Sequence, residues 1–347
     1  MNYDTQTPFD AREVLAAAPD HVAIVAGANP QRPHPLAAAL NLRKIASACA
    51  PAGQRGGNET DVTVMGRGIG STQFSKIMAT GMNAVAVKTF DAQAAEHLAF
   101  TVLMDVQNFN PVSVAAIDAV GVELELLGQN AEIARGAAFL ATGPGAPVQL
   151  TTFARMVGIS REAVINDDLG AFASFIGSLG GSAARLEAQL VAGALEANPI
   201  MADGAVAFDA AHLNVEPEPL GGPALGRAMA MLRNQKTAGG QLAAQRARHL
   251  VVSPDDEFMA HHLVADAGLS ESLAVAVLAS LPAGRWYLLA DPTTCPVIAT
   301  LRLAGTTKKV VVEQRKQPLN TEGAFVTVRA DTGACLLRRT GIVRGGA

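Results

Sequence analysis

A glycine run in the first fifth of the chain has the spacing of a phosphate-binding loop. Gly66 to Ser71 reads GRGIGS and follows a short β-prone stretch, Asp61 to Met65, where a dinucleotide fingerprint would stand. The sixth position is Ser71 instead of glycine, and the helix signal after it is indistinct. We interpret the run as a flexible joint and keep nucleotide binding as the alternative.

The histidine pair His261-His262 is the second feature that could carry chemistry. Glu257 lies four residues before His261, and Asp266 lies four residues after His262, so a metal-ligating pair could form on one face of a helix. Polar residues on a helix surface explain the same pattern, and we prefer that interpretation. The sequence contains neither a Walker-type G-x-x-x-x-G-K-[ST] motif nor a G-x-S-x-G nucleophile elbow. We therefore predict a protein that is not an enzyme and has no cofactor, metal or catalytic residue.

Composition excludes several further classes. The 347 residues are 49% hydrophobic and 17% charged, with a formal net charge of −4, which excludes a disordered chain and a basic nucleic-acid-binding surface. The length predicts about two domains. Three dispersed cysteines suit a reducing compartment. Neither a secretory signal nor an apolar stretch of about 20 residues is present, so we expect a soluble protein and no membrane.

The first of the elements that would position these residues is an N-terminal region interrupted by helix-breaking residues. Breakers at Pro30 to Pro35 and at Pro51 to Asn58 interrupt short Ala-rich helical pieces, Ala11 to Ala18 and Leu36 to Ala50. This pattern predicts an extended arm over residues 1–70 with little core of its own. Lys76 to Phe109 is mostly helical in pattern, and a β-prone stretch starts at Pro111.

Two alternating segments predict a long β-hairpin over Val120 to Val157. Glu123 and Glu125 lie on the outgoing strand and Arg155 lies on the return strand, beyond a Gly/Pro-rich tip. These charges would form a cross-strand ion pair or contact a neighbouring subunit. A hairpin this thin buries little by itself, so its apolar side is expected to lie on another molecule.

A long helix is the clearest element in the chain. Asn166 and Asp167 are good N-cap residues, apolar residues recur at spacings of three and four from Leu169, and Asn198-Pro199 ends the pattern. The helix would run for about 30 residues, well above the average helix length. It contains glycines that disfavour a helix, which predicts close approach or bending against a neighbour. These are Gly170, Gly177, Gly180, Gly181 and Gly193.

The remaining chain changes from mixed to β-rich. We predict a helix over Ala224 to Lys236, a strand at His249 to Val252 and a second helix ending near Ala267. From Arg285 onward the apolar runs are β-prone and separated by turn residues.

This order of elements resembles the tailed-phage major capsid proteins of the Hong Kong 97 type. Five segments look like the Mu-like major head subunit family and follow one another in the right order across residues 71 to 347. They are ISREAVINDDLGAF (Ile159 to Phe172), AARLEAQLVAGALEANP (Ala183 to Pro199), ADGAVAFDAAHLN (Ala202 to Asn214), RHLVVSP (Arg248 to Pro254) and WYLLADP (Trp286 to Pro292).

The resemblance implies an α+β fold with named parts. Residues 1–70 would be an N-terminal arm, 71–119 the first part of a peripheral domain, and 120–157 an extended loop. Residues 158–202 would hold the spine helix of the peripheral domain, 203–284 an axial domain, and 285–347 the C-terminal β part of the peripheral domain. We expect Gly177, Gly180 and Gly181 to act as a spine hinge during shell expansion.

The resemblance also implies a structural function. Copies of the chain would assemble into hexamers and pentamers of an icosahedral tailed-phage shell that encloses double-stranded DNA. Its partners would be other copies of itself, scaffolding, portal and decoration proteins, and packaged DNA held non-specifically on the inner face. The expected location is the virion, after assembly in the cytoplasm of a bacterial host. The alternatives are an encapsulin-like protein shell and a soluble nucleotide- or metal-binding enzyme.

Overall fold

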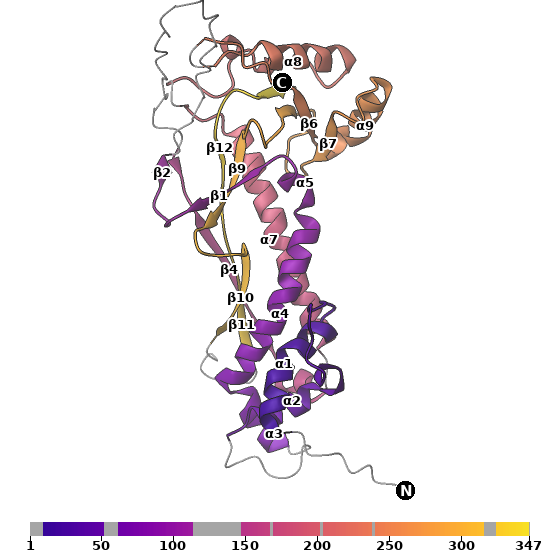
Figure 1. The fold of residues 1–347 in the computed structure, drawn as a ribbon, viewed down its shortest axis with the longest axis vertical. Coiled ribbons are helices and arrows are strands. Elements are labelled where there is room, and N and C mark those ends of the chain that lie inside the picture. Colours follow the sequence, from indigo (N-terminus) through magenta and orange to yellow (C-terminus); the bar gives the residue numbers. More distant parts are fainter. Residues whose placement is uncertain are drawn as a thin grey trace, which may run out of the picture. The chain divides into compact units, whose positions relative to one another are not determined.

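A computed structural model of the chain describes residues 10–51, 62–113, 147–166, 169–201, 204–237, 240–315 and 324–346. Helices and strands are both present in these ranges, which confirms the predicted α+β class (Figure 1). The chain divides into two compact units. Unit 1 consists of residues 1–93, 152–185 and 307–331, and unit 2 consists of residues 94–151, 186–306 and 332–347.

The first described residues of unit 1 form short helices, which confirms the predicted Ala-rich helical pieces. These are α1 (Ala11–Val25), η1 (Ala37–Ala39) and α2 (Leu42–Ala48). Asp10 caps α1 by accepting a hydrogen bond from the Arg12 N–H, and Asn41 caps α2 in the same way through the Lys44 N–H. Buried apolar side chains such as Ile45 give this region a core. The prediction of a segment with little core is therefore wrong for residues 10–50, because the proline-rich stretches separate short helices that pack.

The glycine run lies in a helix. Residues of the predicted β-run form α3 (Val62–Ile69), which is followed by α4 (Thr72–Gln93). A Cβ built on Gly68 would lie 1.8 Å from the carbonyl oxygen of Ala46, so the backbones of α2 and α3 touch at this glycine. The predicted strand and flexible joint are both wrong, because Gly68 serves close helix packing. Nor does a strand lead into this run, as a dinucleotide-binding loop requires.

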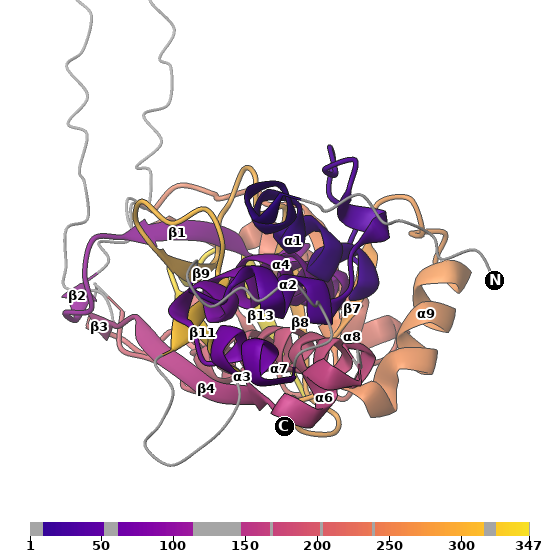
Figure 2. The ribbon, with the colours of Figure 1, turned by 90° about the horizontal axis from the view of Figure 1, so that it is seen from below.

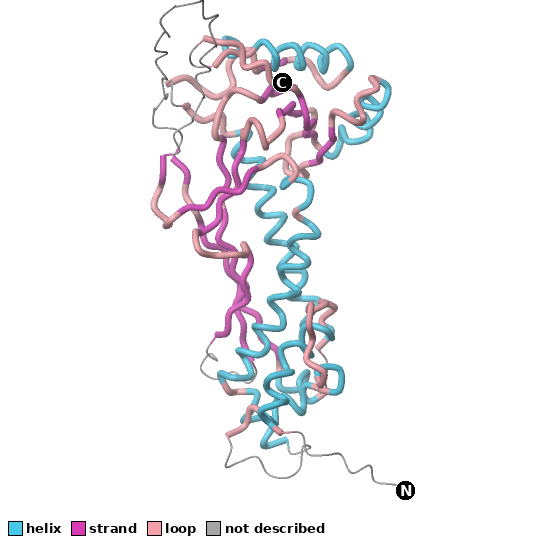
Figure 3. Tube along the Cα trace, in the orientation of Figure 1, coloured by secondary structure: helices cyan, strands magenta, loops and turns pink. Residues whose placement is uncertain are grey.

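Unit 1 also contains a three-stranded sheet, which appears in magenta in Figure 3. Its order is β10-β11-β4, formed by β10 (Val310–Arg315), β11 (Ala324–Thr332) and β4 (Thr151–Ile159). Alternate residues of β11 are buried, as expected of a strand with one covered face. The Val312 N–H of β10 donates to Asn83 Oδ1 of α4 at 3.1 Å, so α4 packs beside this sheet.

The long helix is confirmed as α7 (Gly170–Glu196), which has 27 residues and ends just before Asn198-Pro199. Asn166, predicted as its N-cap, instead ends the short helix α6 (Arg161–Ile165), and Asp167 lies outside the described residues. The first part of α7 belongs to unit 1 and the rest belongs to unit 2.

Unit 2 is built around a five-stranded sheet of order β5-β13-β8-β6-β7. The strands are β5 (Val215–Glu216), β13 (Ile342–Gly345), β8 (Trp286–Ala290), β6 (Ala247–Val252) and β7 (Ala274–Val277). Every residue of the central strand β8 is buried. Tyr287 and Leu289 join an apolar cluster with Leu195 of α7. Trp286 and Leu288 join a second cluster on the other face, under the next two helices.

Those covering helices are α8 (Gly222–Asn234) and α9 (Glu257–Asp266), which the sequence predicts within a few residues. The predicted strand at His249 to Val252 is confirmed as part of β6. The strands β8 and β13, which lie in the predicted 285–347 segment, complete the unit 2 sheet. A strand buried on both faces needs neighbours at both edges, and β13 and β6 supply them. Within the C-terminal stretch, only residues 307–331 belong to unit 1.

The rest of unit 2 consists of small elements. A three-stranded sheet of order β1-β9-β12 is formed by β1 (Val102–Val106), β9 (Ile298–Leu303) and β12 (Ala334–Leu336). The remaining elements are α5 (Ala95–Leu98), β2 (Val112–Ser113), β3 (Pro147–Val148), η3 (Ala210–His212) and η4 (Pro254–Asp256). None of the helices within the described ranges is long and apolar enough to cross a membrane.

Candidate functional site

The histidine pair lies on the exposed helix α9. His262 Nδ1 is 2.8 Å from Asp266 Oδ2, and these side chains are 57% and 71% exposed. Across the part of the chain that the structure describes, no group of three His, Cys, Asp or Glu side chains is placed to hold a metal ion. This exposed contact between His262 and Asp266 agrees with the interpretation that we prefer for the motif, which is polar residues on a helix surface.

Arg155 lies on β4, and its side chain is exposed. Its predicted partners Glu123 and Glu125 lie outside the described residues, as does most of the predicted hairpin. The described neighbour of β4 in the sheet is β11, and Thr152 Oγ1 donates to Asp331 Oδ1 at 2.7 Å between these strands. The intersubunit contact expected of Glu123, Glu125 and Arg155 stays a prediction.

The α7 glycines lie in different surroundings. A Cβ on Gly180 would lie 2.3 Å from Thr89 Oγ1 and 2.4 Å from the carbonyl oxygen of Ala86, both on α4. This confirms that α7 approaches a neighbour closely. At Gly181 the obstacle is the end of a glutamine side chain at 2.4 Å, and at Gly177 the nearest atom is 3.4 Å away. Gly180 therefore has the strictest requirement for glycine of the three.

A buried polar cluster in unit 2 has no counterpart in the sequence predictions. His97 Nε2 of α5 lies 3.0 Å from Glu187 Oε1 of α7, and Thr332 Oγ1 of β11 donates to Glu187 Oε2 at 2.8 Å. The His97 and Glu187 side chains are 2% and 0% exposed. A buried carboxylate is costly unless it is paired, so these contacts hold three distant segments of the chain together. Sequence spacing could not reveal the cluster, because the two side chains of the ion pair are 90 residues apart.

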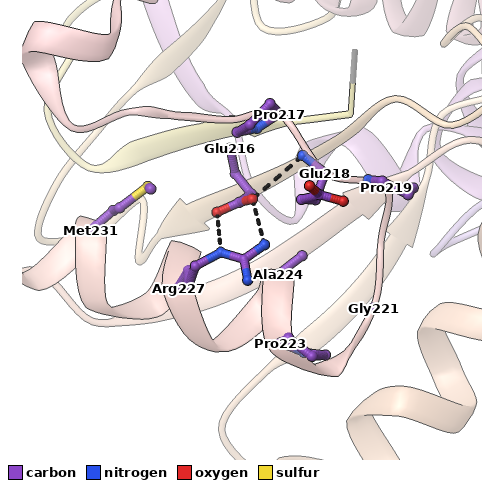
Figure 4. A pocket seen from close by; sticks show the side chains of 9 residues that line it. All are labelled: Glu216, Pro217, Glu218, Pro219, Gly221, Pro223, Ala224, Arg227 and Met231. Carbon is purple, nitrogen blue, oxygen red and sulfur yellow. Dashed lines mark hydrogen bonds and ion pairs between the residues drawn. The ribbon is translucent and has the colours of Figure 1, made fainter.

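A pocket of about 480 Å³ in unit 2 contains a second buried carboxylate (Figure 4). Arg227 of α8 makes two hydrogen bonds to Glu216 of β5, with Nε to Oε2 at 3.0 Å and Nη2 to Oε1 at 2.8 Å. These bonds lower the pKa of the Glu216 carboxyl, although burial acts in the opposite direction. Glu216 is 2% exposed whereas Arg227 is 49% exposed. The pair fixes α8 to the edge of the sheet.

The three cysteines, Cys49, Cys295 and Cys335, are free and buried. Burial raises the pKa of the Cys335 thiol to about 12. A thiol in this environment stays protonated and is a poor nucleophile at neutral pH.

Large exposed apolar side chains are the most unusual feature of the surface. In unit 2, Phe258 is 81% exposed, Ile200 63% and Leu242 62%. In unit 1, Met156 and Phe175 are about half exposed and line an open pocket of about 490 Å³ beside β4 and α7. Contiguous exposed apolar surface marks contact sites for other macromolecules, and Met156 and Phe175 share such a surface in their pocket.

Several solved structures are similar to this chain at low sequence identity. A virus-like particle protein from Pyrococcus furiosus is 10% identical, with a TM-score of 0.46, over 76% of this chain and 96% of that one. A phage-related protein from Bordetella bronchiseptica is 10% identical, with a TM-score of 0.47, over 76% and 95%. The procapsid protein of bacteriophage JBD30 is 14% identical, with a TM-score of 0.41, over 76% and 73%. No curated protein matches the sequence.

A protein-family model described as phage capsid protein matches residues 143–345. The matched range contains α7, both helices that cover the large sheet, and every strand from β3 to β13. The match therefore includes the elements that form both apolar clusters around β8. Because it covers more than half of the sequence, the chain belongs to the phage capsid protein family, and its role is that of a structural protein of the phage particle.

Proposed function

We propose that the chain is the major capsid subunit, which assembles with copies of itself into hexamers and pentamers of an icosahedral shell around double-stranded DNA. The exposed apolar surface carries this proposal. Full burial of a side chain such as Phe258 stabilises an interface by about 1.5–3 kcal/mol. Each such contact recurs in every subunit of a shell, so modest free energies per contact give a stable assembly.

The division of the chain into two units supports their assignment to the two domains expected of a Hong Kong 97-type subunit. Unit 2, with its five-stranded sheet, is assigned to the axial domain around the capsomer axis. Unit 1, with the first part of α7 and the β10-β11-β4 sheet, is assigned to the peripheral domain. Residues 120–157 are the proposed extended loop, and β4 contains its return strand.

Two sets of residues follow from this assignment. Glu123, Glu125 and Arg155 are proposed to contact a neighbouring subunit. No hydrogen bond or ion pair engages the exposed Arg155 side chain within the described residues, which leaves it available. Gly177, Gly180 and Gly181 are proposed as a hinge during shell expansion. Gly180 packs tightly against α4, so bending of α7 would disturb the contact at this residue first.

The charge of the chain suits a container for nucleic acid. A net charge of −4 limits tight binding to packaged DNA, which a strongly basic lining would produce. Contacts with DNA on the inner face would then be weak and non-specific. Scaffolding, portal and decoration proteins are the other proposed partners, and assembly is proposed to occur in the cytoplasm of a bacterial host.

Electron microscopy of the purified, overexpressed protein tests the proposal. We expect icosahedral shells or isolated hexamers and pentamers in negative stain, with a matching mass by sedimentation velocity. A small discrete oligomer or a stable monomer would refute the proposal. Shells that contain a co-purified host protein would favour the encapsulin-like alternative.

A further inference from the structure

Helix α9 of unit 2 has apolar side chains on its exposed side as well as on the side that faces the core. Ala260 and Val264 are buried against the sheet, whereas Phe258 and Met259 are 81% and 53% exposed. A helix that is apolar on all sides is normally buried on all sides. Figures 1 and 2 both show α9 at the outer margin of its unit, where its uncovered side can meet another molecule.

The charged residues beside α9 have one sign. Between residues 255 and 284 every charged side chain apart from histidine is acidic, and the set is Asp255, Asp256, Glu257, Asp266 and Glu271. Asp256 accepts hydrogen bonds from Ser253 and from the Gly284 N–H. Asp255 and Glu257 are exposed and have no side-chain partner among the described residues. We call Asp255, Glu257, Phe258 and Met259 the acidic patch.

The preceding stretch has the opposite sign. Between residues 219 and 254 every charged side chain is basic, and the set is Arg227, Arg233, Lys236, Arg246 and Arg248. Arg227 is held by Glu216, and Arg248 donates to the carbonyl oxygens of Glu271 and Ser272. The other three are exposed and have no side-chain partner in the ranges that the structure describes.

An exposed leucine lies beside one of these three basic residues. Leu242 is 62% exposed, and it forms an isolated β-bridge with Lys236, so the two residues stay side by side. We call Arg233, Lys236, Leu242 and Arg246 the basic patch. Each patch thus has exposed apolar side chains next to unpaired charges, and the charges of the two patches are opposite. Within the described residues, no hydrogen bond or ion pair joins the two patches.

We propose that the acidic patch of one copy docks on the basic patch of a second copy, so that this contact closes the ring of a capsomer. The inference rests on the proposed function and names the surface that it requires. Phe258 and Met259 pack against Leu242, and Asp255 and Glu257 pair with the three basic side chains around it. Because the two patches differ, the contact is head-to-tail, and repetition around an axis gives a closed ring. The apolar centre supplies affinity, and the charges select orientation.

Charge reversal tests the pairing on the full chain. The first variant combines Asp255→Lys and Glu257→Lys, the second combines Arg233→Glu and Arg246→Glu, and the third contains all four changes. We expect each one-sided variant to raise the protein concentration needed for assembly by about tenfold, because like charges then face each other. The third variant restores opposite charges and should assemble nearly as the original chain does.

A second pair of variants tests the apolar part. Phe258→Ser should weaken assembly, whereas Phe258→Met, which keeps a large apolar side chain at the same position, should not. Sedimentation velocity and native mass spectrometry measure assembly. Circular dichroism should show unchanged folding, because each altered side chain is exposed.

The outcomes separate this inference from the proposed function. If the original chain forms shells or rings and the one-sided variants do so equally well, the docking surface is wrong and the capsid function stands. If both one-sided variants fail and the four-change variant also fails while folded, the pairing is wrong. If the original chain stays monomeric, the proposed function is refuted together with this inference.

Discussion

Replacing Gly180 by alanine should destabilise the packing of α7 on α4. The new Cβ would lie 2.3 Å from Thr89 Oγ1 and 2.4 Å from the carbonyl oxygen of Ala86. Thr89 cannot turn away freely, because its hydroxyl donates to the carbonyl oxygens of Val85 and Ala86 in its own helix. The Ala86 oxygen belongs to the backbone, so the two helices must separate.

The magnitude follows from two opposing effects. Overpacking of a tight contact costs about 1–3 kcal/mol. Alanine in place of glycine inside a helix contributes about 0.5–1 kcal/mol in the other direction. The net loss lies between about 0 and 2.5 kcal/mol with a centre near about 1 kcal/mol, and a loss of that size lowers the melting temperature of a domain of this size by about 2–4 °C.

Thermal unfolding followed by circular dichroism measures this loss, and α7 itself supplies the control. Gly193 lies in the same helix, and a Cβ there would meet nothing within 4 Å. Gly193→Ala should therefore raise stability by up to about 1 kcal/mol. Combining Thr89→Ala with Gly180→Ala should restore only part of the loss, because the contact with the Ala86 oxygen remains. The reasoning is refuted if Gly180→Ala and Gly193→Ala have the same melting temperature.

Three further changes have defined outcomes. Gly68→Ala should loosen the N-terminal helices, because its Cβ would lie 1.8 Å from the Ala46 oxygen, and limited proteolysis should show faster cleavage there; unchanged cleavage would contradict this. His97→Leu removes one hydrogen-bond partner of the buried Glu187 carboxylate and should cost about 1–3 kcal/mol in urea unfolding, and a cost below about 0.5 kcal/mol would show that the cluster is not coupled. Arg227→Met removes the group that lowers the pKa of Glu216. That stabilisation is present above the unfolded pKa and is lost as pH falls through the lower folded pKa, so the difference in melting temperature from the original chain should be large at pH 7 and vanish in acid; a difference independent of pH would contradict the assignment.

The candidate site was only partly predictable. The sequence indicates that the surface serves other copies of the chain, and the exposed Phe258 and Leu242 agree with that expectation. The sequence could not show which apolar residues are exposed. Phe258 and Ala260 lie in the same helix, and only the packing of that helix decides that Ala260 is the buried one. The charge reversal between residues 219–254 and 255–284 is visible in the sequence alone. Its significance depends on which of those charges are already paired in the fold.

The sequence by itself determined the elements whose signals lie in contiguous residues. The apolar repeat of α7 and the short apolar run of β8 each specify a helix or a strand, because periodicity and turn residues act over a few positions. Tertiary structure alone decided the contacts between distant segments. Three of these contacts join residues that are far apart in the chain. They are the close packing of Gly68 against Ala46, the His97–Glu187 pair and the position of β8 at the centre of the unit 2 sheet. Such contacts depend on how whole elements pack, and no local pattern encodes that packing.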